Sequence, residues 1–167
     1  MENIPTVKEM FDYVYSELCR GIAGIEISPY CSRSRFDVIE INRNRRLIKI
    51  YEVKSSRQDF ISDNKWQKYL KYCTNFGFVA PEGVIKLDEL PKKVGLVEIS
   101  KVNGELKHDY IKRFSRINKN VSNKNYIKVL EGLVSSKSWG LKEARHQLKC
   151  NNKLIEKLQE GKENDYS

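Results

Sequence analysis

Two carboxylates and a lysine stand at related positions in two neighbouring apolar segments of the sequence. Asp37 lies near the start of residues 36–41, whereas Glu52 and Lys54 lie at the end of residues 47–53 and just beyond it. Carboxylates held one strand spacing apart repel each other unless a lysine or a divalent cation neutralises them. Oxygen ligands favour Mg²⁺ or Mn²⁺, which polarises a phosphodiester and lowers the pKa of a bound water, and a lysine stabilises the developing charge. The three side chains are therefore sufficient for phosphodiester hydrolysis.

The two segments predict a hairpin that brings these side chains together. With a two-residue turn at Asn44-Arg45, where asparagine tolerates left-handed backbone, opposed residue numbers sum to 89. A buried sheet favours this register, because a slip by one residue would turn every isoleucine outward. Lys54 shares the resulting face, on which the opposed pairs are Ile41 with Ile48, Ile39 with Ile50, and Asp37 with Glu52. The alternative is a salt bridge between Asp37 and Lys54, with Glu52 in solvent.

The surrounding segments predict an α/β fold. Thr6 and Glu9 have the form of a capping box before a helix that runs to Leu18, and the two segments above, with one around Ile25–Ile27, predict three strands. A helix over residues 58–72, a strand over 76–80 and a hairpin turning at Asn103-Gly104 follow. We expect a restriction-endonuclease-like α/β/α sandwich with a mixed central sheet.

Charge divides the chain unevenly. Residues 1–111 carry 18 basic and 16 acidic side chains, whereas residues 112–157 carry 12 basic and 3 acidic ones. We expect a core over residues 1–117 and a basic helical extension over residues 118–167 that contains a weak helix-turn-helix pattern. In that extension the candidate phosphate contacts are Lys142, Arg145, Lys149 and Lys153.

The lengths of the apolar segments and the spacing of the cysteines exclude several classes of protein. No segment reaches the roughly 20 apolar residues of a membrane helix, and the first residues do not form a signal peptide. The four cysteines are scattered without a C-x-x-C pair, so we expect reduced thiols and a cytoplasmic protein. The sequence leaves the oligomeric state open, with a homodimer as one alternative.

Longer motifs resemble a known nuclease superfamily. Arg35-Phe36-Asp37-Val38 and Tyr51-Glu52-Val53-Lys54 are similar to motifs II and III of the PD-(D/E)XK nucleases, although Phe36 replaces the proline that names the motif. The run S-x-x-D-F-x-x-D-x-K-W from Ser56 to Trp66, with Phe78–Pro81 and Val94–Leu96, is similar to the MmcB-like DNA repair family within that superfamily. The resemblance covers about residues 5–115.

The resemblance implies roles for particular residues. Asp37, Glu52 and the Val53 carbonyl would hold Mg²⁺ or Mn²⁺, and Lys54 would assist the attacking water. Glu9, Glu17 and Glu26 compete for a further ligand position, and Glu26 is preferred. Asp59 and Asp63 share a helical face, where Arg57, Lys65 or Lys68 can neutralise them. The candidate phosphate contacts near the site are Arg33, Arg35, Lys65 and Lys68, with a solvated surface as the equal alternative.

The expected function is a metal-dependent nuclease that hydrolyses DNA in repair or in phage and mobile-element metabolism. Two alternatives remain open. One is a nucleic-acid-binding module that keeps the nuclease scaffold without catalysis, since binding needs only a basic surface. The other is a protein-interaction subunit of a larger complex.

Overall fold

The structure is a computed structural model that describes residues 4–42 and 47–138 of the 167-residue chain. The chain forms two compact units, Met1–Gly132 and Leu133–Ser167. A helix spans residues 123–138. No helix within the described ranges is long and apolar enough to cross a membrane.

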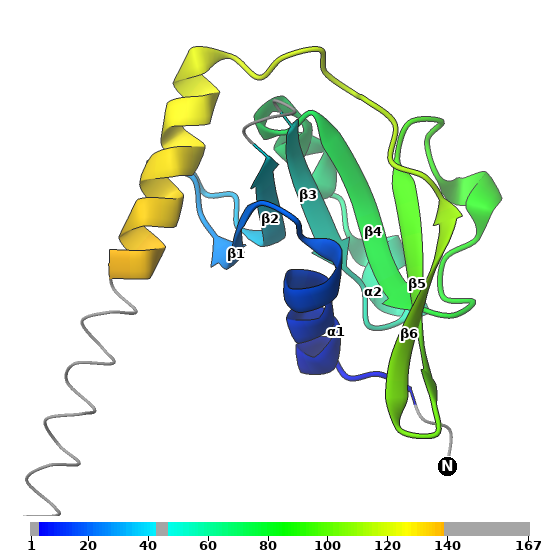
Figure 1. Cartoon of the computed structure of the whole chain (residues 1–167). Helices are drawn as coiled ribbons and strands as arrows, with labels where there is room; N and C mark the ends of the chain where they lie inside the picture. The colour runs from blue at the N-terminus through cyan, green and yellow to red at the C-terminus, as the bar shows by residue number, and fades with distance from the viewer. Residues whose placement is uncertain (1–3, 43–46, 139–167) are drawn as a thin grey trace, which may run out of the picture. The chain divides into compact units, whose positions relative to one another are not determined.

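A six-stranded mixed sheet forms the centre of the first unit, and its strands lie in sequence order (Figure 1). Strands β3, β4 and β5 run parallel to one another, whereas the pairs β1–β2, β2–β3 and β5–β6 are antiparallel. This arrangement confirms the predicted mixed sheet. The strands are β1 (Ile22–Ile27), β2 (Phe36–Asn42), β3 (Leu47–Val53), β4 (Asn75–Pro81), β5 (Gly95–Val102) and β6 (Glu105–Lys112).

The predicted β2–β3 register and the predicted turn between β5 and β6 are confirmed where the structure describes them. The β2–β3 ladder reaches Val38–Tyr51, one step short of the expected Asp37–Glu52 pair. Strands β2 and β3 pair Ile41 with Ile48 and Ile39 with Ile50, and all four side chains are buried. The proposed turn at Asn44-Arg45 lies outside the described residues. Between β5 and β6, Asn103 and Gly104 have φ angles of 53° and 86°, the left-handed backbone that a tight two-residue turn requires.

Helices cover both faces of this sheet (Figure 1). Helix α1 (Val7–Tyr13) begins with the predicted capping box, continues as a π-helical turn over Val14–Leu18, and packs its apolar side on Val38 and Tyr51. Helix α2 (Arg57–Ser62) and the 3-10 helix η2 (Trp66–Tyr72) cover the isoleucine face. There Phe60 and Trp66 pack against the β4 aromatic side chains at ring-centroid distances of 5.2 to 5.6 Å. The predicted α/β/α sandwich is thus observed.

The predicted single helix over residues 58–72 is wrong. Asp63 has extended backbone, with φ −79° and ψ 104°, and ends α2. Its Oδ1 accepts a hydrogen bond from the Lys65 N–H at 2.7 Å, a local turn that competes with helical hydrogen bonding. The chain therefore changes direction at residues 63–65 before η2 begins.

Part of the predicted basic extension belongs to the first unit. Ile117 donates its N–H to the Thr74 carbonyl, and the Asn118 amide donates to the Cys73 carbonyl at 2.9 Å. The predicted boundary at residue 118 stays a prediction. The proposed helix-turn-helix pattern lies outside the described residues, as do its candidate contacts Lys142, Arg145, Lys149 and Lys153.

Candidate active site

The ends of two antiparallel strands position the predicted catalytic side chains. Asp37 is the second residue of β2, Glu52 is the last but one of β3, and Lys54 follows β3 directly. The Lys54 N–H donates to the Val79 carbonyl at 2.8 Å, so it extends the parallel β3–β4 ladder by one residue. All three side chains line one cavity of about 400 Å³. Its full lining consists of Arg33, Arg35, Asp37, Glu52, Lys54, Asp59, Ser62, Asp63, Asn64, Lys65 and Tyr69.

A backbone hydrogen bond fixes Asp37. Its Oδ2 accepts the Val53 N–H at 2.8 Å, so the carboxylate is held across the two strands. Burial raises the pKa of Asp37 to about 6, while the Val53 N–H, Lys54 and Arg35 act in the opposite direction. Burial therefore makes the unpaired negative charge unfavourable at this position.

Glu52 is more deeply buried and is only half satisfied. The residue is 6% exposed, and its Oε1 lies 3.3 Å from Lys54 Nζ. Its Oε2 is buried and has no hydrogen-bond partner. Burial, followed by the nearby Asp37 charge, raises the pKa of Glu52 to about 8. A buried carboxylate oxygen without a partner is costly unless a cation or a donor approaches it.

Lys54 is the buried cation of the site. It is 5% exposed, and its Nζ lies 2.6 Å from Asp63 Oδ2 and 3.9 Å from Asp59 Oδ1, in addition to Glu52. Burial alone would lower the pKa of Lys54, but the hydrogen bond to Asp63 and the charges of Glu52, Asp63 and Asp59 raise it above its usual value. The lysine is therefore charged at neutral pH.

The donor set fits a hard divalent cation. The unpartnered Glu52 oxygen and the neighbouring Asp37 carboxylate are oxygen ligands of the kind that Mg²⁺ binds, usually with waters and substrate phosphates completing its shell. The Val53 side chain is buried in the core beneath α1, so its predicted contribution is restricted to the backbone. Across residues 4–42 and 47–138, no three His, Cys, Asp or Glu side chains are grouped to hold a metal. A cation here would therefore depend on backbone, water or substrate oxygens as well.

The structure brings three of the four basic residues predicted near the site to the cavity, but not the preferred further ligand. Arg33, Arg35 and Lys65 line the cavity, whereas Lys68 lies on the exposed side of η2 outside the lining. Glu26 is exposed and not in the lining, has a φ of 52°, and pairs with Arg35 at 3.4 Å. Its role as a ligand stays a prediction.

The other two glutamates considered for that position lie elsewhere. Glu9 serves the capping box at Thr6 and pairs with Lys101 at 2.7 Å. Glu17 lies on the π-helical turn after α1 and lines a different cavity.

The predicted partners of Asp59 and Asp63 are wrong. We expected Arg57, Lys65 or Lys68 to neutralise them, but the buried Lys54 contacts both, and Arg57 pairs with Glu89. Asp63 follows the last residue of α2, so the two aspartates do not share one helical face, and spacing within a helix could not identify a partner at a strand end. Tyr69, also part of the cavity lining, was expected in the core, and it is 7% exposed.

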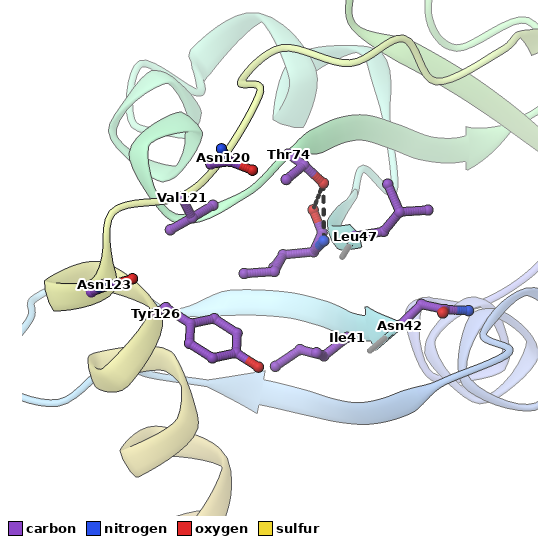
Figure 2. A pocket seen from close by; sticks show the side chains of 9 residues that line it. Ile41, Asn42, Leu47, Thr74, Asn120, Val121, Asn123 and Tyr126 are labelled. Atoms are coloured by element: carbon purple, nitrogen blue, oxygen red, sulfur yellow. Dashed lines mark hydrogen bonds between the residues drawn. The ribbon is translucent and has the colours of Figure 1, made fainter. Parts of the chain in front are cut away.

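Another cavity, of about 490 Å³, lies at the opposite end of β2 and β3 (Figure 2). The Tyr126 side chain extends toward Ile41, and the Thr74 hydroxyl forms hydrogen bonds with the Ile48 backbone (Figure 2). Its lining consists of Ile41, Asn42, Leu47, Ile48, Thr74, Asn120, Val121, Asn123 and Tyr126. None of these nine lining residues is an acidic or basic residue, in contrast to the charged lining of the cavity at the Glu52 end of the strands.

Comparisons with known proteins show a similar fold and a family. One solved structure, the SPO1766 protein of unknown function from Silicibacter pomeroyi, is similar in fold, with a TM-score of 0.59 and 21% sequence identity over 74% of this chain and 79% of that chain. No curated protein matches the sequence. A family model described as DNA repair protein MmcB-like matches residues 15–113, which is more than half of the chain and includes Asp37, Glu52 and Lys54. The chain therefore belongs to the MmcB-like family of DNA repair proteins.

Proposed function

We propose that this protein is a metal-dependent nuclease of the PD-(D/E)XK type that hydrolyses DNA phosphodiester bonds. One observation carries the proposal: Glu52 keeps a buried oxygen without a partner, beside a second buried carboxylate and a charged lysine, in an open polar cavity. Such an arrangement destabilises the fold unless it serves a ligand, and a cation bound to substrate phosphate would use each of these groups.

The residues of the chain would divide the work as follows. Asp37 and Glu52 would hold Mg²⁺ or Mn²⁺, which supplies Lewis-acid activation of a phosphate oxygen and of water. Lys54 would stabilise the negative charge that develops on the phosphate, because its ammonium is desolvated and already fixed in place. Arg33, Arg35 and Lys65, which line the same cavity, would position the DNA backbone.

The test is a cleavage panel with matched variants. Duplex, single-stranded and branched DNA, with an RNA control, are incubated with the protein in Mg²⁺, Mn²⁺ or EDTA. Glu52→Gln and Lys54→Met should abolish cleavage and keep DNA binding, because neither change removes a rim arginine. Glu40→Gln is the matched control: Glu40 is equally buried in the sheet, but it pairs with Lys49 at 3.2 Å and does not line the cavity. Equal cleavage by wild type, Glu52→Gln and Lys54→Met would refute the proposal.

A second candidate is a non-catalytic nucleic-acid-binding module on the same scaffold. It is favoured by the Lys54 contacts, since Glu52 Oε1 and Asp63 already neutralise the lysine without a cation. Tight DNA binding together with no heat of Mg²⁺ or Mn²⁺ binding in calorimetry would support this candidate over the nuclease.

A further inference from the structure

We propose that Asp63 is a positioning residue that keeps the Lys54 ammonium at the active site while Glu52 is engaged by a cation, an inference that rests on the proposed nuclease function. The shortest contact of the ammonium is to Asp63 Oδ2 at 2.6 Å, compared with 3.3 Å to Glu52 Oε1 and 3.9 Å to Asp59 Oδ1. Asp63 is therefore its principal partner.

Asp63 is held rigidly enough to act as an anchor. Its Oδ1 accepts the Lys65 N–H at 2.7 Å, and its own N–H donates to the Phe60 carbonyl at 3.3 Å. The side chain is 9% exposed. One carboxylate oxygen thus accepts the hydrogen bond of the turn that ends α2, and the other forms the short ion pair with the lysine.

The need for such an anchor follows from the two demands on Glu52. In the structure Glu52 Oε1 contacts Lys54, but a cation bound to the same carboxylate would repel the ammonium. A lysine with no other strong partner would then either leave the site or compete with the cation for Glu52. Asp63 provides a carboxylate that is separate from the proposed metal ligands, so the lysine stays charged and in place.

Asp59, in the first turn of α2, offers a matched comparison to Asp63, which caps the end of that helix. Its Oδ2 accepts hydrogen bonds from the Ser55 N–H at 3.0 Å and the Ser55 hydroxyl at 3.2 Å, whereas its Oδ1 lies 3.9 Å from Lys54 Nζ. Its main contacts are therefore to the start of α2. Asp59→Asn and Asp63→Asn remove the same charge, and an asparagine Oδ1 can still accept the local backbone hydrogen bond in each case.

The experiment combines kinetics with a spectroscopic signal from Lys54 itself. Lysine ammonium groups that are buried and hydrogen-bonded exchange slowly with water and give a ¹H–¹⁵N signal, which Lys54→Met identifies. We expect Asp63→Asn to lose this signal and to lower kcat about tenfold or more, with KM for DNA within about twofold, because the lysine is displaced and DNA contacts are not. Asp63→Glu should regain the signal and part of kcat, and Asp59→Asn should lose less of both than Asp63→Asn.

The outcomes separate this inference from the nuclease proposal. An Asp63→Asn protein with the wild-type ammonium signal and wild-type kcat would overturn the positioning role, as would equal losses in Asp59→Asn and Asp63→Asn. If wild type cleaves no substrate, the nuclease proposal fails, and the role of Asp63 in active-site positioning falls with it. If cleavage requires Glu52 and Lys54 but is indifferent to Asp63, the nuclease proposal stands and the inference fails alone.

Discussion

Replacing Glu52 by glutamine should make the protein more stable at mildly alkaline pH while abolishing its proposed activity. In the folded state burial, followed by the Asp37 charge, raises the pKa of Glu52 from its ordinary value of 4.5 to about 8. The folded state therefore binds this proton more tightly than the unfolded chain does. The resulting stability is fully present below about pH 4.5 and is lost as pH rises through about 8. Glutamine resembles the protonated acid in shape and does not ionise.

The magnitude follows from the two pKa values. Each pH unit between them costs about 1.4 kcal/mol, so the stability that Glu52 contributes should fall by about 2.5 kcal/mol between about pH 6 and pH 8.5. This window lies above the range in which Asp37, with a pKa raised to about 6 chiefly by burial, makes most of its own contribution. It also lies above the acid range in which Glu9 and Glu89 titrate, because partner hydrogen bonds lower the pKa of each to about 2.

Urea unfolding of wild type and Glu52→Gln, followed by circular dichroism in the absence of metal across this pH window, measures the effect. The difference in unfolding free energy should grow by about 2.5 kcal/mol in favour of Glu52→Gln as pH rises. Saturating Mg²⁺ should reduce the slope in wild type, because a bound cation stabilises the ionised carboxylate. A difference that stays constant with pH would refute the reasoning that Glu52 is a buried, uncompensated acid.

Three further predictions follow from the same site and fold. Affinity for Mg²⁺ or Mn²⁺ should rise between about pH 6 and pH 8 with release of a proton, because the cation competes with protons on Asp37 and Glu52. Calorimetry in buffers of different ionisation enthalpy would detect the proton release, and an affinity that does not change with pH would contradict the prediction. Replacing both Arg33 and Arg35 by alanine should weaken DNA binding and reduce its salt dependence by up to about two phosphate contacts. Anisotropy titrations at several salt concentrations would measure this change, and an unchanged salt slope would place the DNA elsewhere. Gly77→Ala should destabilise the fold by about 1–3 kcal/mol in urea unfolding, because an added Cβ would lie 2.3 Å from the Phe114 ring. A stability equal to that of wild type would mean that the ring moves aside freely.

Local patterns in the sequence were enough to predict the sheet. The isoleucine alternation selects the β2–β3 register because a slip by one residue would move the isoleucines off the face that α2 and η2 cover, and Asn103-Gly104 supplies the two left-handed residues of the β5–β6 turn. Both are short-range effects. The register in turn placed Asp37, Glu52 and Lys54 at one end of one face, which is where the structure has them.

Longer-range features could not be predicted in the same way. The helix ends after Ser62 because the Asp63 side chain accepts a hydrogen bond from the Lys65 backbone, a local turn that aspartate favours. The apolar residues on both sides of this turn still follow helical spacing, so the sequence pattern alone predicted one continuous helix. The Lys54–Asp63 contact joins a strand end to a helix end, and only the packing of α2 on the sheet brings them together. Spacing within one helix therefore selected helix neighbours as the partners of Asp59 and Asp63 in place of the buried lysine.

The central claim is that Glu52 holds a catalytic metal for DNA hydrolysis, and the most direct test compares DNA cleavage by wild type and Glu52→Gln at equal concentration, in Mg²⁺ or Mn²⁺ and in EDTA. We predict that wild type cleaves only with the metal and that Glu52→Gln binds the same DNA without cleaving it. Cleavage that persists in EDTA, or that is equal in the two proteins, would contradict the claim.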